Sequence, residues 1–212
     1  MSGIKLYNVD LNGIRMRKNL GAIVSGKRLS DLQSHGPYNN VARLGLNGLT
    51  TNSFAASSIH TGIGGGAAAV FDGYTYDPLA STQGMLLHDG YPSTKNGRGY
   101  MHGEAGEVAN QWYSVDFGED VVIGSFQTFT FSNSTYPGQN PKNIQLQTSN
   151  DGLNWTTVFT GACDPKPDDG VTYGNMFTLP HVVSARHYRI FIIDNYGNPS
   201  FTSMGELELY SI

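Results

Sequence analysis

Charged residues and cysteine are both scarce in this sequence. Asp, Glu, Lys and Arg together make up 14% of the 212 residues, against about 25% in ordinary soluble domains. Cys163 is the single cysteine, so the fold has no internal disulfide, which suits a protein that folds in a reducing cytosol. The segment around it, "GACDPKPDDG", predicts a loop thiol with no catalytic base beside it.

Long apolar runs and catalytic motifs are also missing. No apolar segment is long enough to cross a bilayer, and the start, "MSGIKLYNVDLNGIRMRK", lacks the apolar core of a signal peptide. We therefore expect no membrane insertion and no secretion signal. The sequence has no HExxH, GxSxG, P-loop or dinucleotide-binding motif, and its six histidines are scattered. An enzyme is the least expected class, and we assign no catalytic residue.

Charge is distributed unevenly along the chain. Residues 1–50 contain seven Lys or Arg and two Asp, a net charge of +5, and residues 51–212 have a net charge of −9, which together give −4. An acidic body argues against nucleic-acid binding, because phosphate neutralisation needs clustered Lys and Arg. The basic segment either docks onto an acidic partner surface or is a solvated tail, and its composition suits both.

Glycine and aromatic residues are abundant, with 27 Gly, 12 Tyr and 10 Phe, a balance that favours short strands and many turns. In "NIQLQTSNDGLNW", apolar Ile144 and Leu146 alternate with glutamines, as in a strand with one buried face. Asn150, Asp151 and Gly152 then supply turn chemistry, so we interpret Asp151 as a structural residue. Further strand candidates are "WYSVDFG", "VVIGSFQTFTF", "WTTVFT", "NMFTLP", "HYRIFII" and "ELELY".

This spacing predicts an all-β fold, an antiparallel jelly-roll-like β-sandwich, over residues 51–212. Residues 1–50 hold only short apolar stretches, without a period long enough for a helix or sheet of their own. We expect them to form a non-globular N-terminal arm that becomes ordered by docking onto a partner. The stretch from Tyr74 to Gln111 is long for a loop, which marks it as functional, disordered or decorated with minor structure.

Six segments occur in a characteristic order: "FAASS", "AAAVFDGY", "QWYSVDFGEDVVIGSFQTF", "PKNIQLQTSNDGLNWTTVF", "SARHYRI" and "MGELELY". In this order, residues 51–212 resemble the discoidin, or coagulation factor (F5/8) type C, domain of the galactose-binding-like superfamily. The resemblance implies a β-sandwich binding module, with Trp112 and Trp155 packed inward as core anchors. Animal extracellular members usually have a cysteine at each end joined in a disulfide. This chain has neither, so microbial and viral members are the better match.

The resemblance also implies a structural calcium ion. Many galactose-binding-like domains bind it through the Asp of an Asp-Gly loop, nearby carbonyls and a hydroxyl, and a Glu at the start of the last strand, all hard oxygen ligands. Glu206 in "GELELY" matches that glutamate. The loop is matched either by Asp72, which has the better approach in "AAAVFDG", or by Asp89 with Thr94, which has the better "DGxxxT" spacing.

The alternation of the last strand also allows a plain structural interpretation of Glu206. Glu206 and Glu208 would then form the solvent face of a strand whose Leu207 and Leu209 point inward. Both interpretations of Glu206 stay open from the sequence.

Sugar recognition in lectin-like sandwiches lies in loops at one end, where aromatic faces cover apolar sugar faces and fixed polar groups bind hydroxyls. The richest loop is "HDGYPSTKNGRGYMHGE", with "SNSTYPGQN" and "DNYGNPS" as its expected neighbours. The same composition suits a protein-docking surface. The candidate ligand-binding residues are His88, Tyr91, Arg98, Tyr100, His102, Tyr136, Asn195 and Tyr196.

Two functions from different classes follow. One is a non-catalytic module that binds glycans on a cell surface, and the other is an assembly protein that uses the sandwich only for protein contacts. Because the sequence has a basic arm but no secretion signal and no disulfide, we expect a virion component of a tailed bacteriophage, made in the host cytoplasm. It would act as a capsid decoration, fibre or tail-tip module, with residues 1–50 docking onto other virion proteins and the chain forming a homo-oligomer or part of a larger assembly. A free cytosolic lectin is the plain alternative.

Overall fold

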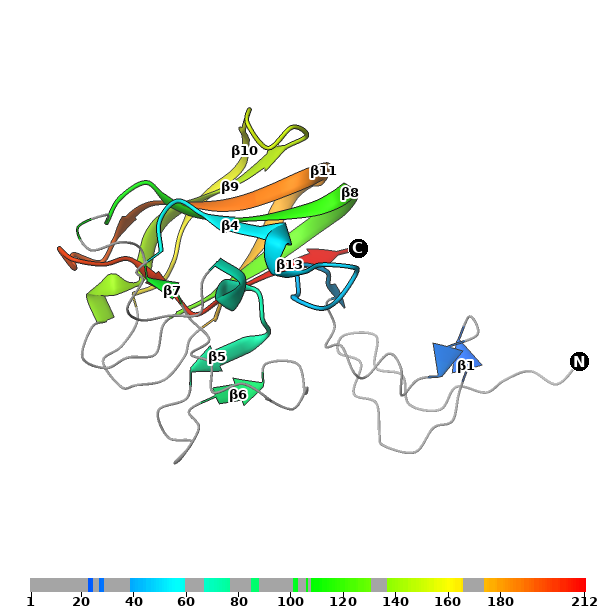
Figure 1. The fold of residues 1–212 in the computed structure, drawn as a ribbon, viewed down its shortest axis with the longest axis horizontal. Coiled ribbons are helices and arrows are strands. Elements are labelled where there is room, and N and C mark those ends of the chain that lie inside the picture. The colour runs from blue at the N-terminus through cyan, green and yellow to red at the C-terminus, as the bar shows by residue number, and fades with distance from the viewer. Residues whose placement is uncertain are drawn as a thin grey trace, which may run out of the picture. The chain divides into compact units, whose positions relative to one another are not determined.

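The computed structural model describes residues 39–59, 67–76, 85–87, 101–102, 106, 108–130, 137–165 and 174–212, together with two short strands that precede them. The chain forms two units, Met1–Gly36 and Pro37–Ile212. In the first unit, the described residues are the antiparallel pair β1 (Ile23–Val24) and β2 (Lys27–Arg28). The second unit contains the sandwich of Figure 1.

Two long strands, β8 (Gln111–Phe129) and β11 (Gly174–Asn195), pair with each other through both layers of the sandwich. In the first layer, β9 (Pro141–Ser149) pairs with β11, β10 (Thr156–Ala162) pairs with β9, and β4 (Phe54–Ala56) pairs with β8. These strands lie side by side across the top of Figure 1. The first layer therefore has the order β10-β9-β11-β8-β4.

The second layer is made by the other halves of β8 and β11 together with β13 (Glu206–Ser211) and β3 (Asn39–Asn40). β13 pairs with β8, and β3 pairs with the outer edge of β13. All pairings in both layers are antiparallel. The predicted all-β, antiparallel sandwich is confirmed.

The passage of β8 and β11 from one layer to the other is marked by a bulge. Arg186 of β11 faces residues 117–120 of β8, which have no partner in the ladder. Nε and Nη2 of Arg186 each donate a hydrogen bond of 2.8 Å to the Asp116 carboxylate, and these bonds lower the pKa of Asp116 to about 2. Gly118 adopts a φ of 77°, a left-handed conformation that favours glycine. At the bulge, Gly118 therefore provides the backbone conformation, and the ion pair of Arg186 with Asp116 joins the two strands.

The core lies between the two layers and follows the alternation of the strands. Fully buried side chains come from both layers; they include Tyr113, Val115, Tyr188, Ile190 and Ile192 from β8 and β11 in the first layer, and Phe126 and Leu209 in the second. Val41, Ala42 and Leu49 belong to the same core, and the Val41 N–H donates to the Leu209 carbonyl at 2.8 Å. Residues 39–50, which the sequence analysis assigned to the arm, are thus packed into the sandwich. Their apolar side chains follow no strand or helix period, so this packing was not predictable from the sequence.

Minor elements decorate the sandwich. Short 3-10 helices are η1 (Thr51–Ser53), η2 (Ala67–Val70) and η3 (Pro137–Gln139). The long stretch after residue 73 contains β5 (Tyr74–Tyr76), which pairs with β6 (Met85–Leu87), and β7 (Met101–His102), which pairs with β12 (Ser203–Met204). This stretch is therefore decorated with minor structure, one of the three possibilities predicted for it. Within the described part of the chain, no helix is both long and apolar enough to span a lipid bilayer.

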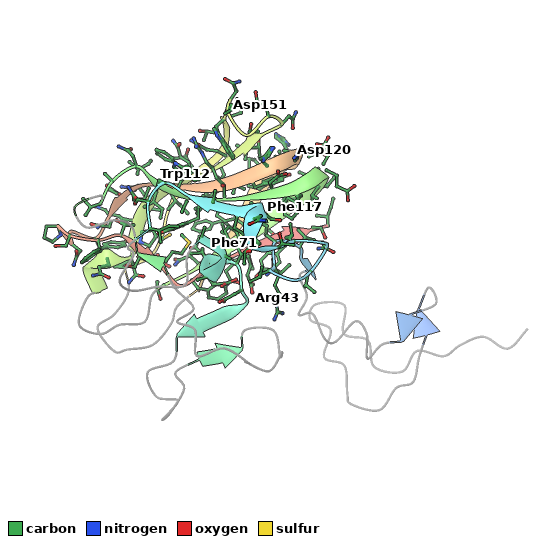
Figure 2. All side chains as sticks on the ribbon, in the orientation of Figure 1. Arg43, Phe71, Trp112, Phe117, Asp120 and Asp151 are labelled. Atoms are coloured by element: carbon green, nitrogen blue, oxygen red, sulfur yellow. The ribbon has the colours of Figure 1, made fainter. Side chains whose placement is uncertain are left out.

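Trp112 and Trp155 are not core anchors, so that expectation is wrong. Both are half-buried, and neither belongs to the core cluster; Figure 2 labels Trp112 on its strand. The inward position on β8 belongs to the next residue, Tyr113, because successive side chains of a strand point to opposite faces. The turn before Trp155 is structural, as predicted, since Asp151 Oδ1 accepts the N–H groups of Leu153 and Asn154 at 2.8 Å each.

Two buried tyrosines make a matched test of the core. The Tyr188 hydroxyl bonds with the carbonyls of Val121 and Val183 at 2.6 and 2.7 Å, whereas the Tyr113 hydroxyl has no partner among the described residues. Tyr188→Phe should therefore lower the free energy of unfolding by about 1 kcal/mol, and Tyr113→Phe should raise it by a similar amount. Urea melts of both variants check this. A loss of stability in Tyr113→Phe would mean that its hydroxyl bonds to a buried water.

Candidate functional site

One end of the sandwich gathers three segments that are far apart in the sequence. They are residues 106 and 108–110 before β8, residues 137–140 before β9, and residues 195–203 from the last residue of β11 onward. Backbone hydrogen bonds join them: Gly106 N–H donates to Ser200 O at 2.8 Å, and Asn198 N–H donates to Gly138 O at 3.2 Å. We call these three segments the end loops. Two of them contain parts of the predicted neighbouring loops "SNSTYPGQN" and "DNYGNPS", whereas the segment before β8 follows the third predicted loop, "HDGYPSTKNGRGYMHGE".

Asn195, a predicted ligand-binding residue, organises the end loops from the last position of β11. Its side-chain amide donates to the carbonyls of Asn198 and Phe201 at 3.0 Å each and lies 3.1 Å from Thr202 Oγ1. Its Oδ1 accepts the N–H of Gly197 at 2.8 Å. Because an amide has two donor hydrogens, the donors of Asn195 are already used within the loop. The residue therefore positions the loop.

Tyr196 is the aromatic candidate that lies within the described residues. It is half-buried, and its hydroxyl donates to the carbonyl of Cys163. Partial burial raises its pKa, so the phenol stays neutral at physiological pH. Gly138, which the sequence analysis did not single out, lies against it: a Cβ there would be 3.1 Å from the Tyr196 carbonyl oxygen. A larger residue at Gly138 would therefore require this contact to widen by a few tenths of an ångström.

Cys163 differs from its predicted setting, because its side chain is buried, with 5% exposed. Burial raises the pKa of its thiol to about 11, so the group is a protonated thiol at neutral pH and has no nucleophilic character.

The other sugar-site candidates are described only in part. His102 lies in β7, opposite Ser203 of β12, which brings its backbone to the end loops. The remaining candidates lie outside the described residues; they are His88, Tyr91, Arg98, Tyr100 and Tyr136. Asp89 and Thr94, one of the two proposals for the metal loop, also lie outside them.

The second candidate site surrounds Glu206, the first residue of β13. Glu206 is completely buried, and its Oε1 accepts the N–H of Gly73 at 3.0 Å. The loop Asp72–Gly73 follows η2, so the structure brings Asp72 and Glu206 together. Glu208 is also buried, with 4% exposed, while Leu207 and Leu209 point inward as predicted. The alternative in which both glutamates face solvent is therefore wrong.

The charge of Glu206 is poorly compensated. Burial raises its pKa well above the usual value, the charges of Asp72 and Glu208 raise it further, and the hydrogen bond from Gly73 and the charge of Arg43 oppose the rise. Oε2 of Glu206 is buried and has no hydrogen-bond partner within the described residues. A buried carboxylate oxygen without a partner is costly.

Arg43 delivers a positive charge to this site from the segment after β3. Its guanidinium packs against Gly73, where a Cβ atom would lie 2.8 Å from Nε and 2.9 Å from Cζ. Gly73 also has a φ of 80°, so both space and conformation require glycine there. Arg43 itself is 6% exposed, and Figure 2 labels it with Phe71 near the same loop.

The residues around Glu206 fit a hard cation. Two carboxylates approach each other, and one buried carboxylate oxygen lacks a partner, as expected where an ion supplies the missing contact. No group of three or more His, Cys, Asp or Glu side chains suited to a metal occurs in the described part of the chain. Backbone carbonyls or hydroxyls would therefore have to complete the ligand set, as they commonly do for Ca²⁺.

The family follows from comparison with known domains. The family model of the F5/8 type C domain matches residues 53–207. This chain belongs to the F5/8 type C family. The match begins after β3 and Arg43, so this F5/8 type C domain includes an edge strand and a buried cation that lie before the matched region.

Solved structures share the fold of this F5/8 type C domain. One is a chitosan-binding module 1 from a chitosanase/glucanase of Paenibacillus sp. IK-5, with 22% identity over 82% of this chain and 100% of that one, and a TM-score of 0.53. Another is CpGH89CBM32-5 from Clostridium perfringens in complex with GalNAc-β-1,3-galactose, with 19% identity over 76% and 97% and a TM-score of 0.52. A third is the family 32 carbohydrate-binding module of C. perfringens NanJ in complex with galactose, with 17% identity over 76% and 96% and a TM-score of 0.50. Comparison with curated proteins gave no match.

Proposed function

We propose that this F5/8 type C domain is a non-catalytic carbohydrate-binding module that binds glycans through its end loops. The observation that supports this most directly is the convergence of the end loops on a fixed framework, joined by backbone hydrogen bonds and the Asn195 side chain. Loops held by a rigid sandwich are suited to recognition. The structural neighbours agree with the proposal, since one is a chitosan-binding module and two are in complex with galactose and GalNAc-β-1,3-galactose.

Tyr196 is the described residue best suited to contact a sugar. Its hydroxyl is fixed on the Cys163 carbonyl, so its ring is held in one orientation, and a fixed aromatic face can cover the apolar face of a pyranose at low entropic cost. His102 and the residues of the neighbouring loop would add polar contacts to hydroxyls.

A glycan array that includes galactose, GalNAc-β-1,3-galactose and chitotriose tests the proposal. Tyr196→Ala should weaken binding by about tenfold, because the ring is lost, whereas Tyr196→Phe should keep most of the affinity. Asn154→Ala, in the turn at the other end of β9, is the matched control and should bind like the wild type. Absence of glycan binding by the wild type would favour the assembly-protein alternative, and equal binding by Tyr196→Ala would place the site elsewhere.

We also propose that a structural calcium ion bridges Asp72 and Glu206. The ion would supply the contact that Glu206 Oε2 lacks and would offset the repulsion between the two carboxylates. It would thereby fix the loop that follows η2 against the start of β13.

Thermal melts with and without calcium test this ion. In protein stripped with EDTA, free calcium at 100 times its Kd should add about 2.7 kcal/mol of stability. Glu206→Gln should abolish most of that gain, and Glu119→Gln, on the exposed bulge of β8, should retain it. Identical melting temperatures in calcium and EDTA would contradict the ion and leave Arg43 as the cation that acts on Glu206.

The proposal on location is that the module is a virion component of a tailed bacteriophage, held in the particle by its N-terminal segment. The basic charge of residues 1–50 supports docking onto an acidic surface. The free cytosolic lectin remains the alternative.

Because residues 39–50 pack into the sandwich, the deletion that tests docking should remove residues 1–36 only. We expect the shortened protein to keep its melting temperature and its glycan binding but to be absent from purified particles. Incorporation equal to that of the full chain would contradict the docking role of this segment.

A further inference from the structure

A second group of half-buried side chains lies on the outer face of the first layer, away from the end loops and from Glu206. Its centre is Arg189 of β11, which pairs with Ser114 of β8 on one side and Gln147 of β9 on the other. Three aromatic rings surround the guanidinium: its Cζ lies 4.2 Å from the ring centroid of Trp155, 5.4 Å from that of Phe191 and 5.6 Å from that of Trp112. We call this group the Arg189 face.

Hydrogen bonds with side chains of the neighbouring strands hold the guanidinium group of Arg189 in place. Its Nε donates to Gln147 Oε1 at 2.6 Å. Gln147 is itself buried, with 8% exposed, and its Nε2 donates to Gln145 Oε1 at 2.8 Å and to Thr157 Oγ1 at 3.2 Å. The aromatic contacts and these hydrogen bonds hold the guanidinium group of Arg189 in one orientation before any ligand binds. The side chain of an ordinary surface arginine is free to change rotamer.

No described residue supplies a counter-charge for Arg189. Within the described residues, it makes no ion pair, and its two terminal nitrogens make no hydrogen bond. Arg186, three residues earlier on the same strand, is by contrast paired through two nitrogens with Asp116. Partial burial lowers the pKa of Arg189, and no carboxylate opposes this. An unpaired, partly desolvated cation of this kind can accept an external anion as its partner.

We propose that the Arg189 face is a second glycan-binding site, which takes sugars that bear a carboxylate, such as uronic acids. The two free nitrogens of Arg189 receive the carboxylate as a bidentate pair, and the exposed parts of Trp112 and Trp155 contact the apolar side of the sugar ring. A single fixed fork suits a single planar carboxylate. Nucleic acids and anionic membranes would need several clustered cations. The site does not depend on the end loops.

The chain provides its own probe for this site, because its two tryptophans both belong to the Arg189 face. Titration with trigalacturonate should change the tryptophan fluorescence in a saturable way. Galactose oligomers and the methyl ester of trigalacturonate, which lack the charged carboxylate, should leave it unchanged. Tyr196→Ala should not alter the titration, so failure of the end-loop site and failure of this site are distinguishable.

Three variants test the role of Arg189. Arg189→Met should abolish the response, and Arg189→Lys, which keeps the charge but loses the fork, should weaken binding at least about tenfold. Arg186→Met, which removes a neighbouring cation already paired with Asp116, should bind like the wild type. If Arg186→Met and Arg189→Lys weaken trigalacturonate binding equally, the binding depends on the overall positive charge of the surface, and the proposal is overturned. Lack of any response in the wild type would also overturn it, and a lower melting temperature in Arg189→Met would then leave Arg189 as a structural clamp. If Arg189→Met does not fold, the weaker binding expected of Arg189→Lys and the lack of response expected with the methyl ester of trigalacturonate still test the proposal.

Discussion

The pairing of β8 with β11 is the interaction on which the rest of the sandwich depends. Among the described strands, these two run through both layers, so each layer is built outward from the same ladder. The ladder also explains where the end loops lie. β8 starts and β11 ends at the same end, and contacts such as Asn110 N–H to Ile193 O at 3.3 Å continue the pairing just beyond the strand. Loops that follow such a ladder begin from fixed positions, which a recognition site requires.

The burial of Glu206 carries an electrostatic cost, because its side chain is completely buried and its Oε2 has no hydrogen-bond partner within the described residues. Its hydrogen bond to Gly73 joins residues 133 positions apart in the chain, so the same carboxylate that costs desolvation also fastens η2 and its loop to the last strand. Breaking that contact would free the loop from the sheet. Alternative packings that broke this contact would leave the carboxyl group of Glu206 still less satisfied.

Strand identity, antiparallel class and the turn at Asp151 were predictable from the sequence because they depend on local alternation and turn chemistry. The side of the sheet to which each tryptophan points was not predictable. Trp112 and Tyr113 are adjacent, and alternation says that they point opposite ways without saying which one points to the core. The core takes Tyr113, and the larger indole lies over Arg189 instead.

The sites were harder to predict than the fold. The sequence related Glu206 to an Asp-Gly loop through family resemblance, yet it gave no sign of Arg43, because a lone arginine in "VARLGL" looks like a surface residue. Its burial follows from the pairing of β3 with β13, a contact across nearly the whole chain that no local pattern encodes. Gly138 was missed for the same reason, since the atoms that exclude a Cβ there belong to a distant loop.

The position of β3 also has a mechanical consequence. Tension on the chain before Pro37 reaches the sandwich first at Asn39 and Asn40, which pair with Ser211 and Tyr210 at the outer edge of the sheet. Two residue pairs at the edge of a sheet are a weak attachment. The next residues along the chain that attach to the sandwich are Val41 and Ala42, which pack into the core. Arg43 follows directly after these residues. A pull strong enough to peel the edge strand would therefore draw the guanidinium away from Gly73 and the buried carboxylate, so that strain at the N-terminal edge is transmitted into the charge balance at Glu206.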